Sequence, residues 1–239
     1  MNPALALAAL SLLAGPVHAD PGYYVVRPYG DKGVSTVELR YWTVKPRDGI
    51  ERVWPELGFA HGVTSRWTTG LFASGVGRQG QAVRLGSWNW TNDLMLTQGE
   101  WPIDVALHTQ LIRNRGEGSA IEFGPVLRTD IGRTEIGVNV FWDRAFNTLE
   151  PRRTELKLQW QLRHRALPGL QVGVQGFSEL GPWNDWSPRR EQSHRAGPAL
   201  SGQWRSDGAR MLDWHAAWLV GDTYGRHGHM FSSRLAWSF

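Results

Sequence analysis

The stretch that best indicates the fold is RTELKLQWQLRH, from Arg153 to His164. Every second side chain in it is apolar: Leu156, Leu158, Trp160 and Leu162. The side chains between them are charged or amide-bearing: Glu155, Lys157, Gln159, Gln161 and Arg163. Because a β-strand points successive side chains to opposite faces, one face is apolar and the other hydrophilic. This contrast is typical of a strand with lipid on one side and water on the other.

The same alternation recurs along the chain in segments of about ten to twelve residues, the length of a tilted strand that crosses a bilayer. It is clear in the segments 103–111, 135–143, 212–218 and 231–239. The sequence therefore predicts an all-β fold, a transmembrane antiparallel up-and-down barrel of about twelve strands, with ten or fourteen as alternatives. The expected spans are 34–45, 50–61, 66–77, 82–96, 102–113, 119–130, 133–144, 153–164, 170–181, 194–205, 210–220 and 229–239.

Some of these segments are irregular. The alternation changes phase within 82–96, which predicts a β-bulge near Gly86. Pro55, Pro125 and Pro198 each remove a hydrogen-bond donor from a predicted strand. The connections expected on the periplasmic side are short. The three longest, at 146–152, 182–193 and 221–228, all fall on the opposite side, as in outer-membrane barrels.

The N-terminal residues predict export. An uncharged apolar run from Leu5 to Leu13 is followed by Gly15 and Pro16, and small residues precede a cleavage point after Ala19. Residues 1–19 are thus a predicted signal peptide, residues 20–33 an N-terminal segment, and residues 34–239 the barrel. The segment 20–33 either enters the lumen and plugs it or forms a periplasmic extension.

Composition narrows the function. The chain has no Cys, which excludes disulfides and thiolate chemistry. The sequence is rich in Trp and Gly, with 14 and 28 residues. Its net charge of +4 is mild and is not concentrated on one face, so nucleic-acid binding is not expected. Eight indoles near predicted strand ends are expected to form two aromatic girdles at the lipid headgroups. They are Trp42, Trp54, Trp67, Trp101, Trp142, Trp204, Trp218 and Trp237.

The last strand, 231–239, ends on an aromatic residue. With the export signal and the repeated amphipathic strands, it resembles bacterial outer-membrane β-barrel proteins. The resemblance implies location in the bacterial outer membrane, contact with its lipid and lipopolysaccharide, and an assembly signal at Trp237 and Phe239 read by the barrel-insertion machinery. The opening YYVVRPY (Tyr23–Tyr29) and the strand from Glu38 to Trp42 look similar to small proteobacterial barrels and, more distantly, to transporters of phenol-degradation gene clusters. No substrate follows from that likeness.

The inward faces collect most ionisable side chains. The acids are Glu38, Glu56, Asp93, Asp104, Glu122, Glu135, Asp143, Glu155, Glu179 and Asp213; the bases are Arg40, Arg128, Lys157, Arg163, Arg195 and Arg234. Such a mixed lining predicts either a hydrated pore that acts on charged solutes or a lumen closed by paired charges. The mid-strand residues expected to contact a solute are Glu38, Arg40, Asp104, His108, Glu122, Arg128, Glu155, Lys157 and Arg234. No sequence argument places two of them in contact.

Other chemistry is weakly indicated. There is no G-x-S-x-G motif. The candidate bases are scattered along the sequence, and no Ser is placed so that it is expected to pair with one of them: His61, His108, His164 and His215. For His227 and His229, with Asp222 nearby, a solvated loop is favoured over a metal site. Trp183 and Trp186 are expected to form an exposed pair of indoles. We therefore expect no enzyme activity, metal or cofactor. The preferred hypothesis is a channel or transporter for a small, unidentified solute. The alternatives are a closed barrel acting through its outer loops and, less favoured, a lipid-modifying enzyme.

Overall fold

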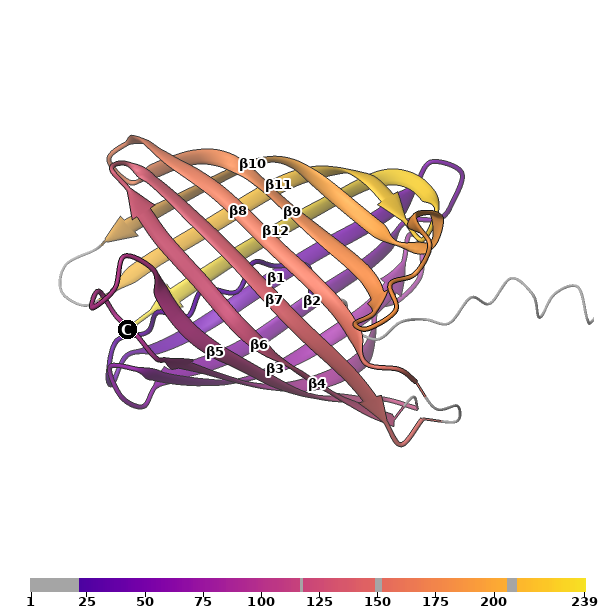
Figure 1. Cartoon of the computed structure of the whole chain (residues 1–239), viewed down its shortest axis with the longest axis horizontal. Coiled ribbons are helices and arrows are strands. Elements are labelled where there is room, and N and C mark those ends of the chain that lie inside the picture. The colour runs from indigo at the N-terminus through magenta and orange to yellow at the C-terminus, as the bar shows by residue number, and fades with distance from the viewer. Residues whose placement is uncertain (1–21, 117, 149–151, 206–209) are drawn as a thin grey trace, which may run out of the picture.

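The computed structural model describes residues 22–116, 118–148, 152–205 and 210–239 (Figure 1). These residues form one closed antiparallel barrel in which each strand pairs with its neighbours in sequence. The predicted signal peptide lies outside the described residues. The strands are β1 (Ser35–Pro46), β2 (Arg52–Gly62), β3 (Trp67–Arg78), β4 (Arg84–Met95), β5 (Asp104–Asn114), β6 (Gly118–Ile131), β7 (Thr134–Phe146), β8 (Glu155–Leu167), β9 (Leu170–Pro182), β10 (Ser193–Arg205), β11 (Met211–Thr223) and β12 (Arg226–Ser238).

The barrel closes where β1 pairs with β12, in a register that sets Thr36 opposite Ser238. Beyond this pair, Ser35 and Phe239 exchange two backbone hydrogen bonds, each of 2.9 Å. The C-terminal residue therefore takes part in closure of the sheet. We call the end of the barrel that holds Ser35 and Phe239 the terminal end, and the opposite end, which holds residues 183–192, the loop end.

The twelve predicted strands are confirmed, with ends that shift by a few residues. The bulge is confirmed too: Ser74 pairs with Ser87 and Gly75 with Leu85, so Gly86 is the extra residue. Each proline interrupts one ladder and leaves the other intact. Pro55, for example, is opposite Tyr41 on β1 but has no partner in the ladder with β3. One interrupted ladder is tolerated because the other still holds the strand in the sheet.

One predicted long connection is wrong. β11 and β12 extend to Thr223 and from Arg226, so only Tyr224 and Gly225 connect them. Both residues have positive φ, 46° and 75° respectively, as a two-residue hairpin turn of the primed type requires. We predicted a loop at 221–228 because this stretch is rich in Gly and polar residues. The alternation of apolar and polar side chains is therefore not visible at the two strand ends that it contains. The connections 147–154 and 183–192 are long, as predicted.

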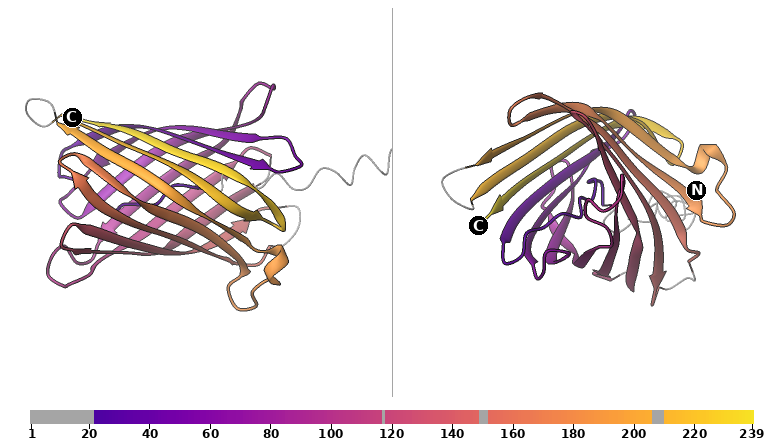
Figure 2. Two further views of the ribbon diagram at one scale, coloured as in Figure 1. Left: turned by 90° about the horizontal axis from the view of Figure 1, so that it is seen from above. Right: turned by 60° about the vertical axis from the view of Figure 1, so that its left-hand side comes forward.

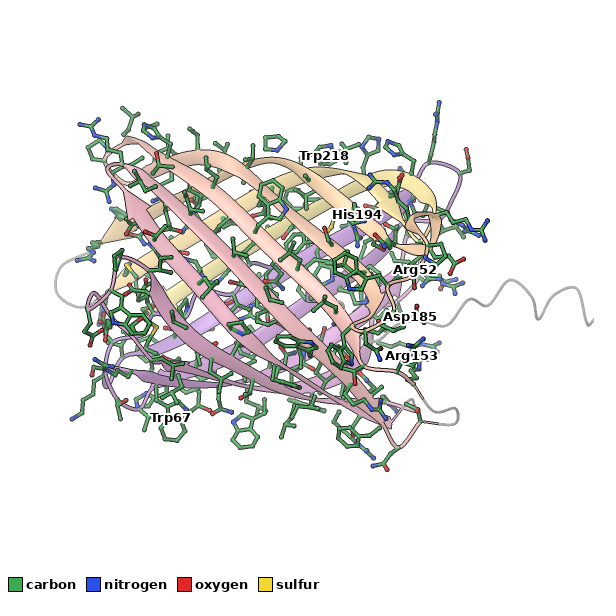
Figure 3. All side chains as sticks on the ribbon, viewed as in Figure 1. Arg52, Trp67, Arg153, Asp185, His194 and Trp218 are labelled. Carbon is green, nitrogen blue, oxygen red and sulfur yellow. The ribbon has the colours of Figure 1, made fainter. Side chains whose placement is uncertain are left out.

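Large apolar side chains are exposed on the outer face along the strands, and Figure 3 shows side chains that project outward all around the barrel. Among the predicted girdle residues, Trp67 and Trp204 are exposed near strand ends and Trp101 is exposed in a turn, whereas Trp218 is exposed within β11, five residues before its end. The prediction is wrong for Trp42 and Trp54, whose exposed fractions are 0% and 6%. These two indoles share the inward face of β1 and β2 with Arg40 and Glu56, and they pack inside the barrel.

In the part of the chain that the structure describes, a glycine pairs with an aromatic residue across three ladders: Gly58 with Phe72, Gly176 with Trp160, and Gly202 with Trp214. A Cβ added to the glycine would lie 1.8 Å from the Phe72 ring in the first pair and 2.6 Å from an indole in the other two. The aromatic ring thus lies over a bare backbone and shields it, a known way to stabilise glycine in a sheet. This explains part of the high content of both residue types.

Among the described residues, no helix is long and apolar enough to cross a membrane. The inside of the barrel is lined by polar side chains and also contains residues 22–34. From here on, the name N-terminal segment refers to these described residues, in place of the predicted range 20–33. This segment is seen among the strands in Figure 2, where the view is turned partly toward the barrel axis. Its buried residues Tyr23, Tyr24 and Val26 belong to the same cluster as Trp42 and Phe141.

Candidate functional site

The N-terminal segment runs through the lumen and is held there by hydrogen bonds to the barrel wall. The amide side chain of Asn139 donates to the Val26 carbonyl oxygen at 3.2 Å, and the Val26 backbone N–H donates to Gln159 Oε1, also at 3.2 Å. Ser232 Oγ donates to the Tyr23 carbonyl oxygen at 2.7 Å. The anchors come from β7, β8 and β12, so the segment bridges distant parts of the wall. Near Gly33 it reaches the terminal end and continues into β1.

Three tyrosines of this segment each contact an inward arginine. The guanidinium carbon lies 4.1 Å from the ring centre for Arg195 and Tyr23, and 3.6 Å for Arg40 and Tyr24. For Arg128 and Tyr29 the distance is 4.6 Å. A cation over an aromatic face is attracted by the ring quadrupole, most strongly where water is excluded. The aromatic opening of the segment therefore matches the basic side chains of the lumen.

The tyrosine hydroxyls add polar contacts. Tyr23 donates to Glu179, which also binds Arg195. Tyr29 Oη donates to Asp104 at 2.6 Å. Burial, followed by this hydrogen bond to a carboxylate, raises the pKa of Tyr29. Tyr29 is therefore neutral and able to donate at physiological pH.

Charged side chains along β1 form the largest ion-pair network. Arg40 binds Glu38 and, at 2.8 Å, Glu56. Arg234 Nε lies 2.8 Å from Glu38, and its Nη1 lies 2.8 Å from Asp213. The three acids and two bases of this network, on β1, β2, β11 and β12, therefore pair with one another across neighbouring strands. Such pairing fixes the side chains against the wall.

A second network surrounds one lysine. Lys157 Nζ lies 2.9 Å from Glu122 and 2.6 Å from Asp143. Glu155 also interacts electrostatically with both Lys157 and Asp143. Glu122 and Asp143 thus share one ammonium group on the wall formed by β6, β7 and β8. This part of the lumen carries an excess of negative charge.

The remaining predicted residues lie closer to the terminal end. Arg128 and Arg163 both bind Glu135. His108 Nδ1 lies 2.6 Å from Asp93, and its ring packs against Phe141 with ring centres 5.0 Å apart. Asp104 accepts from Tyr29 and from the Gly99 backbone N–H. His108 is thus anchored to a carboxylate and an aromatic ring.

All nine predicted lumen residues point inward, and the structure brings several together: Glu38 with Arg40 and Arg234, and Glu122 with Lys157 and Glu155. Asp104 and Arg128 both contact Tyr29, the first through its hydroxyl and the second through its ring. His108 contacts Asp93 and Phe141 instead. Their action on a solute stays a prediction. The sequence did not indicate Asn139 and Gln159 as anchors of the N-terminal segment. Their amides alternate with apolar residues like other lumen positions, but nothing local distinguishes an anchor from an ordinary lining residue.

The lumen contains a cavity of about 440 Å³ beside the N-terminal segment. On one side it is bounded by residues of the segment, including Tyr24, Val26 and Arg27. It extends to the terminal end, where Gly62, Arg210 and Ser238 contribute to its wall. Arg27 lies 3.3 Å from Asp213, so the segment also joins the ion-pair network at this cavity.

The predicted His227–Gly228–His229 stretch does not converge on a metal-binding geometry. His227 Nδ1 lies 2.9 Å from Asp222, whereas the ring of His229 lies against Trp218, with ring centres 5.6 Å apart. The described part of the chain contains no group of three His, Cys, Asp or Glu side chains arranged to hold a metal ion. His227 and His229 are instead used in separate local contacts.

A closed antiparallel barrel with an apolar exterior and a polar, charged lumen is the architecture of bacterial outer-membrane channels. No family model and no curated protein sequence matches the chain. Among solved structures, it is similar to the COG4313 outer membrane channel from Pseudomonas putida F1, with a TM-score of 0.62 and 13% identity over 92% of this chain and 99% of that one.

Two porins show the same likeness. NanC has a TM-score of 0.57 at 11% identity, and KdgM 0.56 at 8%. Each match covers 85% of this chain and 98% of the porin. The chain therefore has the fold of an outer-membrane channel, and the predicted class is confirmed. The narrower likeness to transporters of phenol-degradation clusters stays a prediction.

Proposed function

We propose that the chain is a channel of the bacterial outer membrane that passes small solutes and is closed by its N-terminal segment. The observation that carries the proposal is the occupant of the lumen. The segment is not a strand of the barrel, and side-chain hydrogen bonds and tyrosine–arginine contacts hold it in place. Because such contacts are individually weak and reversible, the segment can leave a lumen whose wall stays intact.

The shape of the lumen supports the same proposal. Tyr23, Glu179 and Arg195 occupy the lumen toward the loop end, whereas the cavity extends to the terminal end. Its volume of about 440 Å³ lies in the range of small-molecule sites. The polar wall is already formed around it, so opening requires movement of the segment alone. The similar solved structures are a channel and two porins, which favours transport over catalysis as the main role.

The charge of the lumen provides the test. Lys157→Ala leaves Glu122 and Asp143 without their ammonium partner, so the lumen becomes more negative and should favour cations. In planar bilayers separating unequal KCl concentrations, we expect discrete conductance steps from the full mature chain. The reversal potential of Lys157→Ala should shift toward the K⁺ equilibrium potential.

Lys45→Ala is the matched control, because Lys45 is an exposed residue on the outer face of β1. It removes the same charge and should leave the reversal potential unchanged. A barrel that folds, shown by heat-modifiable gel migration, yet stays silent in all three proteins would refute the channel. That result would favour a closed barrel that acts through its loops, which the extensive ion pairing of the lumen also permits.

A further inference from the structure

Among the described residues, three pairs of a hydroxyl and an imidazole lie on outward-facing positions of the barrel. They are Ser35 with His61, Thr134 with His164, and Ser178 with His194. The oxygen and Nδ1 are 3.0 Å apart in each pair, and the two residues are direct partners across a ladder. Within the described ranges, the second ring nitrogen of His61 and of His164 has no protein hydrogen-bond partner. These two pairs are simple cross-strand contacts.

The third pair differs because the second nitrogen of His194 is engaged. His194 Nε2 lies 2.7 Å from Gln192 Oε1. The other end of this amide is fixed as well, because Gln192 Nε2 donates to the Ser187 carbonyl oxygen at 2.7 Å. The amide oxygen must therefore face the ring, and an amide oxygen can only accept.

The protonation of the imidazole follows from this chain of bonds. His194 Nε2 carries the proton and donates it to Gln192, so Nδ1 of the neutral ring is a free base. Ser178 Oγ then donates to Nδ1. A hydroxyl that donates to a base, which is itself oriented by a third group, is the arrangement of an activated nucleophile. The sequence did not indicate it, because Ser178 and His194 belong to separate strands.

The surroundings indicate what could reach the site. Ser178 and His194 lie near the loop end, on the outward faces of β9 and β10. Leu158 is directly opposite Ser178 on β8, and Asp222 is directly opposite His194 on β11. Figure 3 shows His194 and Trp218 toward the same end of the barrel as Arg153 and Asp185, and away from Trp67. A reactant approaches this face from the lipid and its headgroup region, where the acyl esters of lipids are found.

We propose that Ser178, His194 and Gln192 form a site that hydrolyses carboxylic esters of membrane lipids, in addition to the channel. Ser178 Oγ bonds to the ester carbonyl carbon while its proton passes to His194 Nδ1. The bond to the alcohol oxygen then breaks, and that oxygen takes the proton from His194. Water, deprotonated by His194, releases the fatty acid and restores Ser178. Gln192 acts as a positioning residue that keeps the proton on Nε2, and Asp222 favours the transient imidazolium electrostatically.

The test uses the full mature chain in detergent micelles and a fluorescent alkyl fluorophosphonate, which forms a stable bond with an activated serine. We expect stoichiometric labelling of the wild type at Ser178, identified by mass spectrometry, and loss of labelling in Ser178→Ala and His194→Ala. Ser35→Ala is the matched control, because it removes the serine of a pair that lacks the third group. Its labelling should equal that of the wild type.

Release of fatty acid from dilauroylphosphatidylglycerol vesicles is the second measurement and should follow the same order. Gln192→Glu places a carboxylate beside Nε2, which stabilises the imidazolium, so the acidic limb of the pH–rate profile should move to higher pH. A purely structural contact would not produce this shift. A folded wild-type barrel that is not labelled, or labelling that persists in Ser178→Ala, would overturn the proposal whether or not the protein conducts.

Discussion

Replacement of Tyr23, Tyr24 and Tyr29 by alanine is expected to turn a channel that is mostly closed into one that conducts steadily. The triple variant loses three contacts with inward arginines and the hydroxyl bonds to Glu179 and Asp104. Each cation–π contact contributes about 1–2 kcal/mol in such a setting, or roughly 3–6 kcal/mol together. A loss of that size shifts the ratio of closed to open barrels by roughly two to four orders of magnitude.

The measurement is the fraction of time spent in the open state in planar bilayers. Tyr41→Ala is the control, because Tyr41 lies on the outer face of β1 and packs against Phe231. It removes the same side chain without touching the lumen and should behave like the wild type. If the triple variant folds and its open fraction does not change, the tyrosines do not hold the segment in a closing position.

Arg40→Met is expected to give the largest loss of stability among single substitutions in the lumen. Arg40 is buried, binds Glu38 and Glu56, and lies against the rings of Tyr24 and Phe72. Removal of one partner from a buried ion pair leaves an uncompensated charge and costs about 3–5 kcal/mol. Urea-induced unfolding in lipid vesicles should show a loss of this order in the free energy of unfolding.

Two further variants separate charge from packing. Arg40→Met combined with Glu56→Gln also removes the negative charge of Glu56, which has lost its arginine. This double variant should recover a large part of the lost free energy of unfolding. Lys45→Met, on the outer face of the same strand, should change the free energy of unfolding by less than about 1 kcal/mol. An unfolding free energy of Arg40→Met equal to that of Lys45→Met would contradict the importance of the network.

Most of the fold could be predicted from the local alternation of apolar and polar residues. Alternation in Arg153–His164 and its repeats marks each strand and assigns each side chain to one face, since both follow from the pleat alone. The same logic could have corrected the two wrong girdle assignments, since Trp54 has the parity of Glu56 on β2. Trp42 has the parity of Glu38 and Arg40, so its place in the lumen was implied by β1 itself, and proximity to a strand end was the weaker signal.

The site depended on information that no local pattern holds. Which inward charges meet is decided by register, and a register of two strands is set by the turn between them and by closure of the whole barrel. Lys157 on β8 binds Glu122 on β6, two strands away. His194 contacts Ser178 although a ten-residue connection, Trp183 to Gln192, separates their strands. The course of the N-terminal segment was likewise open, because a short aromatic stretch shows no period that fixes its partners.

The central claim is that the N-terminal segment closes the lumen, and a reversible cross-link tests it most directly. The chain has no natural cysteine, so Val26→Cys and Asn139→Cys provide the only two thiols, at positions that share a hydrogen bond in the native lumen. A short bis-methanethiosulfonate should join them in the folded barrel and abolish channel openings, and a reducing agent should restore the openings. Val26→Cys alone should show neither effect. A folded double variant that fails to cross-link, or that conducts unchanged once cross-linked, would contradict the account.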